Sequence, residues 1–126
     1  MFTPVLKLEH SDSRGEIYSV TLPGERELML LHSKEGSLRG GHAHDVDEIV
    51  VMLTGKMRYH IKNDKDEYEE IALAGESTFH PASEYHMGEF LEDTWLIEWK
   101  IGTSKGQSKN IDDPAWRERV KTNVTK

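Results

Sequence analysis

The sequence contains no cysteine among its 126 residues. Disulfide bonds and thiolate metal sites are therefore excluded, and any bound metal must be held by histidine and carboxylate side chains. No segment approaches the roughly 20 apolar residues that span a bilayer, and the N-terminus has no basic region followed by an apolar stretch. We therefore expect a cytoplasmic protein with no membrane partner.

Basic residues are also scarce. The chain has 16 lysines and arginines against 23 aspartates and glutamates, which gives a net charge of -7. Nucleic acids and anionic membranes both attract proteins through basic surfaces, so neither is an expected partner. A small-molecule substrate is the expected partner.

Short segments with the residue types of β-strands follow one another along most of the chain. They are mostly rich in β-branched or aromatic residues and are separated by turn residues. We expect strands at 16–22, 27–32, 48–54, 56–62, 68–73, 77–80, 86–91 and 94–101. The predicted fold class is all-β, an antiparallel sandwich or barrel formed by residues 1–101.

Two of these segments alternate clearly between an apolar and a more polar face. The apolar positions are Met57, Tyr59 and Ile61 in one segment and Trp95, Ile97 and Trp99 in the other. Side chains of this kind are expected to fill the core, although those of the second segment would also suit the wall of an apolar cavity.

The last 25 residues differ in composition from the rest. Residues 102–126 are expected to form a polar loop, up to about residue 110, and then a short helix that begins at Pro114. Asp112 or Asp113 would serve as the N-cap. The alternative is a frayed tail. Trp116 favours a docked helix, because a large aromatic side chain gains most from burial.

The stretch GGHAHDVDE, residues 40–48, places two histidines two positions apart in a run typical of a strand. The side chains of His42 and His44 therefore project from the same face, and Glu48 has the same parity. Imidazole and carboxylate groups without sulfur suit one divalent transition metal: Fe, Zn, Mn, Ni, Co or Cu. Surface strands also carry such histidine pairs without a function.

The spacing around these residues resembles the two sequence motifs of the cupin superfamily. The first motif is matched by Gly36, His42, His44, Glu48 and Gly55, and the second by Gly75, Pro81 and His86. Two positions depart from the family pattern. Ser83 stands where a glycine is expected, and Phe90 stands where an asparagine is expected.

This resemblance implies a double-stranded β-helix, the jelly-roll barrel of cupins. It also implies one metal ion inside the barrel, with His42, His44, Glu48 and His86 as ligands. Such a set would leave one or two coordination positions for substrate or water. The alternative is a hydrogen-bonded polar cluster in a barrel that has lost its metal. Cupins often pair through sheet edges, so a homodimer is a further expectation.

A fainter resemblance concerns cupins that act on nucleotide-linked sugars, the deoxysugar epimerases and ketoisomerases. It rests on the stretches SDSRG and RGGHAH. It implies that Arg14 and Arg39 bind the anionic part of a substrate, a role suited to guanidinium groups. Ordinary turn and surface pairing would also explain both arginines. Glu48 departs from this group, which commonly works without a metal.

Tyr59 and Tyr85 are candidate proton donors near the pocket, although Tyr59 would equally suit the core.

These motifs and candidate residues are consistent with three functions. The first is a metal-dependent enzyme of dioxygenase or isomerase type that acts on a small molecule. The second is a metal-independent sugar-nucleotide epimerase or ketoisomerase, and the third is a non-catalytic small-molecule binding module.

Overall fold

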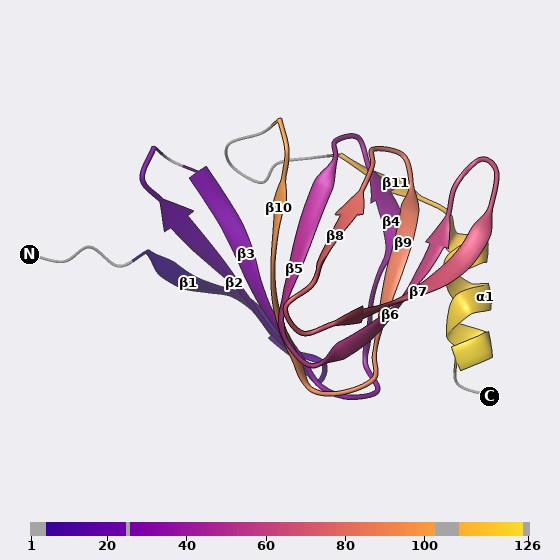
Figure 1. The fold of residues 1–126 in the computed structure, drawn as a ribbon, viewed down its shortest axis with the longest axis horizontal. Helices are drawn as coiled ribbons and strands as arrows, with labels where there is room; N and C mark the ends of the chain where they lie inside the picture. Colours follow the sequence, from indigo (N-terminus) through magenta and orange to yellow (C-terminus); the bar gives the residue numbers. More distant parts are fainter. Residues whose placement is uncertain (1–4, 25, 103–108, 125–126) are drawn as a thin grey trace, which may run out of the picture.

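The computed structural model describes residues 5–24, 26–102 and 109–124, which form two antiparallel sheets and one helix (Figure 1). The strands are β1 (Leu6–Asp12), β2 (Gly15–Leu22), β3 (Arg26–Ser33), β4 (Leu38–His44), β5 (Glu48–Thr54), β6 (Lys56–Lys62), β7 (Glu67–Leu73), β8 (Ser77–His80), β9 (Tyr85–Phe90), β10 (Thr94–Lys100) and β11 (Asn110–Asp112). The helix is α1 (Pro114–Val124). Within these residues, no helix is long and apolar enough to cross a membrane.

The chain crosses repeatedly from one sheet to the other. The six-stranded sheet has the order β1-β2-β3-β10-β5-β8, and the five-stranded sheet has the order β11-β4-β9-β6-β7. Several neighbouring pairs, such as β3 with β10 and β4 with β9, therefore come from distant parts of the sequence, as in a jelly roll. The all-β fold class with one short C-terminal helix is confirmed.

The core lies between the two sheets and is formed mainly by β5, β6, β9 and β10. The alternation predicted for residues 56–62 is confirmed, because Met57, Tyr59 and Ile61 are buried while their neighbours along β6 are half-buried. Phe90, at the position where the family has asparagine, joins this core. Gly55 has a φ of 86°, and a Cβ there would lie 2.2 Å from the Thr94 hydroxyl oxygen, so only glycine fits the turn between β5 and β6.

The prediction that Trp95, Ile97 and Trp99 on β10 fill the core or line an apolar cavity is wrong. Leu96 is buried in the core, and Glu98 and Lys100 on the same face line a cavity inside the barrel. Trp95, Ile97 and Trp99 are half-buried and have the opposite parity, so they lie on the outer face of the six-stranded sheet. Beyond Leu96 the interior is a cavity, so the charged Glu98 and Lys100 face inward and the other face of this strand points outward.

The C-terminal segment is docked, and the alternative of a frayed tail is wrong. Residues 110–112 pair with β4, and α1 packs Trp116 and Val120 against Met87. The Asp113 carboxylate accepts a hydrogen bond from the Trp116 backbone N–H at 3.2 Å, so Asp113 is the N-cap. Most of the predicted loop, residues 103–108, lies outside the described residues.

Trp116 is expected to anchor the C-terminal segment, because its side chain is only 1% exposed. Replacing it with alanine should lower the free energy of unfolding by about 3–5 kcal/mol, since the cavity left behind cannot fully collapse. Denaturant unfolding followed by circular dichroism measures the change. Ile71→Ala, at a position on β7 that is 44% exposed and away from α1, is the control and should cost far less. Equal losses in the two variants would show that α1 is not held by Trp116.

Candidate metal centre

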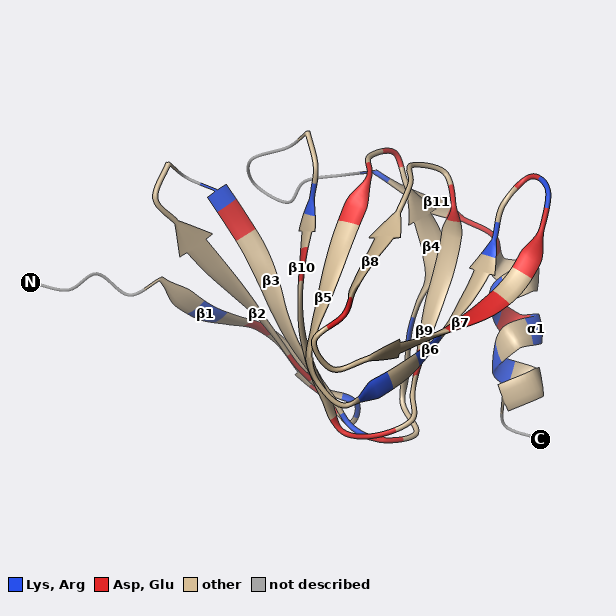
Figure 2. Ribbon diagram, viewed as in Figure 1, with Lys and Arg blue, Asp and Glu red and all other residues tan. Residues whose placement is uncertain are grey.

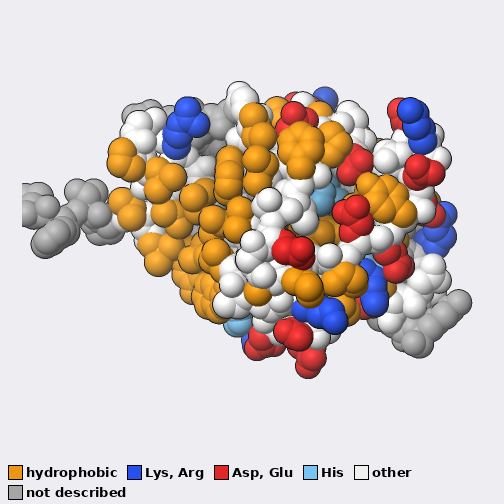
Figure 3. Space-filling model, in the orientation of Figure 1, with side chains coloured by type: hydrophobic (Ala, Val, Ile, Leu, Met, Phe, Trp, Pro, Cys, Tyr) orange, Lys and Arg blue, Asp and Glu red, His pale blue; other side chains and the backbone are white. Residues whose placement is uncertain are grey.

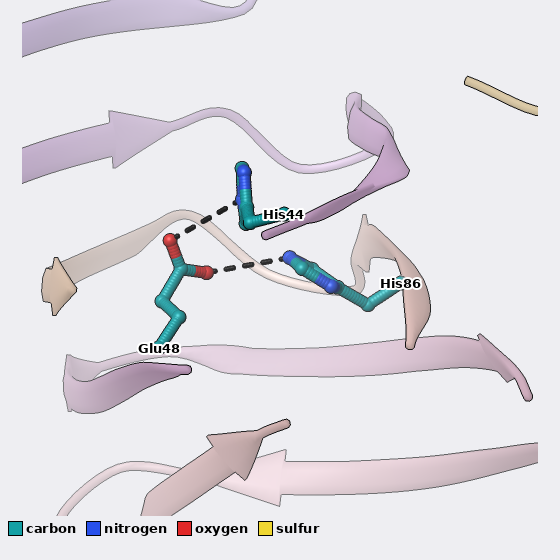
Figure 4. A group of neighbouring side chains, drawn as sticks. All are labelled: His44, Glu48 and His86. Atoms are coloured by element: carbon teal, nitrogen blue, oxygen red, sulfur yellow. Dashed lines mark ion pairs between the residues drawn. The ribbon is translucent and has the colours of Figure 1, made fainter. Parts of the chain in front are cut away.

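Three side chains that could hold a metal ion converge inside the barrel. They are His44 at the end of β4, Glu48 at the start of β5 and His86 on β9, and one ligand atom from each lies within 4.8 Å of the other two. The Nε2 atom of His44 is 3.5 Å from Glu48 Oε2, and that of His86 is 3.3 Å from Glu48 Oε1 (Figure 4). All three side chains are buried. The donor set of two imidazoles and one carboxylate suits a divalent transition metal.

Both histidine rings are oriented by hydrogen bonds on their far side. His44 Nδ1 lies 3.0 Å from the side-chain oxygen of Asn110 in β11, and His86 Nδ1 lies 3.3 Å from the Glu84 carbonyl oxygen. Because both partners are acceptors, each Nδ1 donates a proton to them, so a neutral ring would bind a metal through Nε2. In this structure the His86 Nε2–H instead donates to Glu48. A histidine ring whose Nδ1–H is hydrogen-bonded to an acceptor in this way is typical of a metal ligand. The residues present therefore fit a bound divalent ion.

The protonation states of these groups follow from burial and mutual charge. Burial lowers the pKa of His44 to about 4, so this ring is neutral near pH 7, as a metal ligand must be. Burial alone would raise the pKa of Glu48, but His86, Lys100 and His44 outweigh it and lower the pKa to about 2. The His86 pKa is raised, because the hydrogen bond and charge of Glu48 outweigh the effect of burial. The centre thus holds a permanent carboxylate.

His42 lies beside this group but not within it. Its ring centroid is 5.1 Å from that of His44 and 6.4 Å from that of His86, and it lines the same cavity. A bulge interrupts the pairing of β4 with β9 between Gly40 and His42. The tight group therefore contains three of the four predicted ligands, and the role of His42 stays a prediction.

The cavity next to these residues has a volume of about 360 Å³ and receives cationic side chains from several strands. Arg39 on β4 is only 8% exposed; its Nε donates to the Ser33 hydroxyl at 2.7 Å and its Nη2 to the His32 carbonyl at 3.2 Å. Burial, with nearby Arg14, lowers the Arg39 pKa. Among the described residues no ion pair to Arg39 is seen. Its charge is therefore desolvated, and the carboxylates of Asp12, Glu98 and Glu16 act on it only from a distance.

Arg14 also lines the cavity, from the turn between β1 and β2. Its guanidinium contacts both carboxylate oxygens of Asp12, with Nη2 at 2.6 Å from Oδ2, and this pairing raises the Arg14 pKa. The predicted turn at SDSRG therefore holds Arg14 in place. Arg14 is already neutralised by a carboxylate, whereas Arg39 is not.

Sequence reasoning missed two charged residues in the cavity, Glu98 and Lys100 on β10. Lys100 Nζ lies 3.3 Å from Glu48 Oε2. Burial and the charge of Glu48 raise the pKa of Glu98 to about 7. Their position on the more polar face of an alternating strand was the available signal, but polarity alone does not show that a face lines a cavity.

The two tyrosines occupy different environments. Tyr59 is buried at the cavity wall, its ring 4.6 Å from that of His80, which stacks on His86 at 4.4 Å. Burial raises the Tyr59 pKa, so it holds its proton firmly. Tyr85 does not line the cavity, and the prediction that it is a proton donor there is corrected: it packs beside Trp116 of α1 at 6.0 Å. Neighbours along a strand face opposite sides, so Tyr85 points out where His86 points in.

The turn that leads to His86 contains an unusual backbone conformation. Ser83 has a φ of 68°, at the position where the cupin pattern has glycine. The turn is held by hydrogen bonds from the Ser83 N–H to the His44 carbonyl and from the Ala82 N–H to Asp47, both at 2.8 Å. These contacts keep a non-glycine residue in the left-handed region, which costs roughly 1–2 kcal/mol.

Ser83→Gly is expected to stabilise the protein. Relief of the strained φ outweighs the greater chain entropy of glycine, so the free energy of unfolding should rise by about 1 kcal/mol. Chemical denaturation of the wild type and the variant measures this change in the free energy of unfolding. Ser77→Gly, in a strand, is a matched control and should destabilise instead. A loss of stability in Ser83→Gly would mean that the serine side chain itself supports the turn.

No family model and no curated protein sequence matches this chain. Solved structures do match. Over 88% of this chain, the capsular polysaccharide assembling protein CapF from Staphylococcus aureus superposes with a TM-score of 0.72 at 22% identity. Lactobacillus farciminis oxalate decarboxylase, in a formate complex, gives 0.70 at 17% identity over 88%. KdgF from Halomonas sp. gives 0.62 at 15% identity over 73% of this chain and 82% of its own.

These likenesses identify the protein as one of the cupin fold. The chain spans about one third of the length of the matched CapF and oxalate decarboxylase chains, 33% and 34%. At these identities the comparison establishes the barrel and not the chemistry. The chemistry must be argued from the cavity.

Proposed function

We propose that the protein is a metal-binding cupin that acts on a small anionic molecule. The carrying observation is the convergence of His44 Nε2, Glu48 and His86 Nε2 in a buried cavity, with the opposite ring nitrogens held by Asn110 and Glu84. His42, whose ring centroid lies 5.1 Å from that of His44, is the fourth proposed ligand. The metal is one divalent transition ion, and when bound it supplies Lewis-acid polarisation of a carbonyl or activation of dioxygen.

The environment of Arg39 supports the proposal that the substrate is anionic. Its guanidinium faces the cavity, is buried, and has only hydroxyl and carbonyl acceptors among the described residues. A carboxylate or phosphate would neutralise this charge and form the bidentate contact to which guanidinium is suited. Arg14 would add long-range attraction while staying paired with Asp12. The substrate would then extend from Arg39 toward the His44 and His86 rings.

Glu98 is the proposed proton-transfer residue. It lies on the cavity wall, and its pKa of about 7 lets it hold or release a proton near neutral pH. Tyr59 keeps its proton and serves to position substrate through its hydroxyl. An isomerase-type reaction needs such a group beside the carbon that loses and regains a proton.

Lys100 supports a second candidate function. Its ammonium group lies 3.3 Å from Glu48 and occupies part of the space that a cation beside that carboxylate would use. A barrel whose carboxylate is neutralised by its own lysine has no need of a metal. In that case the cavity acts as a metal-independent isomerase or epimerase site, or as a non-catalytic binding site for the same anion.

Elemental analysis of protein purified without a His tag or added metal separates these candidates. About one equivalent of a transition metal is expected in the wild type, and most of it should be lost in Glu48→Gln and His86→Ala. Asn110→Ala should keep the ion but bind it about 10- to 100-fold more weakly, because His44 loses its orienting partner.

His60→Ala is the matched control for metal content. His60 lies on β6 with its ring against Glu89 at 3.1 Å, outside the cavity, so full occupancy is expected. Full occupancy in Glu48→Gln and His86→Ala as well would refute the assigned centre. A metal-free wild type that takes up no ion on reconstitution would support the second candidate.

Anion binding can be tested independently of the metal. Phosphate and malonate should raise the melting temperature of the wild type, and Arg39→Met should bind them at least about tenfold more weakly, because a desolvated charge contact is lost. Each variant is compared with its own anion-free baseline. Arg119→Met, on the exposed face of α1, is the control. Unchanged binding in Arg39→Met would remove Arg39 from the substrate site.

A further inference from the structure

Lys100, at the end of β10, presents an ammonium group to the carboxylate of the candidate metal centre. β10 and β5 pair antiparallel, and their register places Lys100 directly opposite Glu48. Figure 2 shows the basic end of β10 and the acidic start of β5 at the same end of the sheet. Lys100 Nζ lies 3.3 Å from Glu48 Oε2, and the two side chains are 11% and 3% exposed. A metal ion bound by Glu48 must therefore compete with an ammonium group that is already there.

Both oxygens of this carboxylate have neighbours. Oε1 accepts from His86 Nε2 at 3.3 Å, and Oε2 lies 3.5 Å from His44 Nε2 as well as beside Lys100. The two histidines suit a bound ion as ligands, because imidazole nitrogen binds transition metals. An ammonium group has three N–H donors and no acceptor lone pair, so Lys100 cannot be a ligand. Of the three neighbours of Glu48, Lys100 is the one that a dication repels.

The charge of Lys100 is held by a single contact. Among the residues that the structure describes, Glu48 is the only partner of its ammonium group. Arg14 differs, because its guanidinium contacts both carboxylate oxygens of Asp12. A lysine ammonium is a compact charge on a flexible four-carbon chain. Lys100 can therefore change partners while the backbone of β10 stays in place.

On leaving Glu48, the ammonium group would need another anion, because a buried charge without a partner is costly. The outer side of β10 is apolar: Trp99 lies there, and Figure 3 shows hydrophobic side chains over β1, β2, β3, β10 and β5. Glu98 lines the same cavity as Lys100, but its pKa of about 7 leaves it only partly charged at neutral pH. A ligand in the cavity supplies the full negative charge that Glu98 does not.

The charges of the cavity indicate how many negative charges this ligand carries. Arg14 is neutralised by its own carboxylate partner, and Arg39 has no ion pair among the described residues. With a dication bound by neutral histidines, two positive charges of the ion join those of Lys100 and Arg39 and are opposed by Glu48. The excess is then three positive charges. A dianion together with ionised Glu98 balances this excess, whereas a monoanion leaves a buried charge uncompensated.

We infer that Lys100 exchanges partners and thereby selects the substrate: it pairs with Glu48 while the metal site is empty, and with a small dianion held between Lys100 and Arg39 once a metal is bound. The inference rests on the metal centre proposed above, and it adds the charge of the substrate and a residue that recognises it. Metal and dianion favour one another in this scheme, because each stabilises the state in which Lys100 has left Glu48.

Titration with Zn²⁺ tests the competition for Glu48. Lys100→Leu should bind Zn²⁺ at least about tenfold more tightly than the wild type, because the ion no longer displaces an ammonium group. Lys100→Arg keeps the charge and should stay close to the wild type. Lys7→Leu, on β1 with a side chain 76% exposed, is the matched control for the lost charge. Equal affinities in the wild type and Lys100→Leu would overturn the exchange, whereas no uptake of Zn²⁺ by either protein would refute the metal centre itself.

Sulfate and methanesulfonate test the charge of the ligand, because these tetrahedral anions are similar in size and differ by one negative charge. The zinc-loaded wild type should bind sulfate at least about tenfold more tightly than methanesulfonate. Lys100→Leu should lose most of this preference, and Lys7→Leu should keep it. Equal affinities for the two anions in the wild type, or an unchanged preference in Lys100→Leu, would overturn the role of Lys100 in recognition.

The movement of Lys100 is observable in the wild type alone. Reductive methylation with formaldehyde labels accessible lysine amines, and mass spectrometry of the peptides locates the label. Lys100 should react slowly in the metal-free protein, faster with Zn²⁺ bound, and slowly again when sulfate is added, while Lys7 reacts equally in all three states. Constant reactivity of Lys100 in zinc-loaded and metal-free protein would overturn the exchange, and this result decides if Lys100→Leu does not fold.

Discussion

The buried carboxylate of Glu48 is the group on which the rest of the site depends. An ionised carboxylate in a barrel interior is costly unless opposite charge or hydrogen-bond donors surround it. His44, His86 and Lys100 reach it from β4, β9 and β10, strands that belong to both sheets. The jelly-roll crossing of the chain between sheets is what brings these three elements around one point. The same arrangement of strands therefore forms the barrel and brings the site residues together.

Much of the fold could be predicted from the sequence, because alternation with a period of two survives in short strands. Its limit is visible at β10. Alternation separates Trp95 and Ile97 from Glu98 and Lys100, but it does not state which set faces inward. Glu98 and Lys100 face inward because they line a cavity, and a cavity is a property of the assembled sheets. Tyr85 is the opposite case, because the sequence alone could have placed it. Adjacent residues of a strand point to opposite faces, so Tyr85 faces away from the cavity if His86 faces into it.

The candidate site was predictable to the extent that its residues fall in a local pattern. His44, Glu48 and His86 follow motif spacing, whereas Asn110 comes from a three-residue strand after a polar segment with no strand-like signal. Ser83 departs from the family pattern, and the structure shows the result: a positive φ in a turn that hydrogen bonds to His44 and Asp47 hold in place. The departure therefore changes the local strain and leaves the path of the chain intact.

The attachment of β11 has a consequence for how the cavity communicates with the end of the chain. Asn110 touches His44, and two residues beyond β11 the helix α1 begins, held by Trp116. Any ligand that fixes the His44 ring therefore favours the docked C-terminal segment, and by thermodynamic reciprocity docking of that segment favours the ligand. Hydrogen exchange of the amides in α1 thus becomes a remote reporter of occupancy in a cavity that the helix never touches.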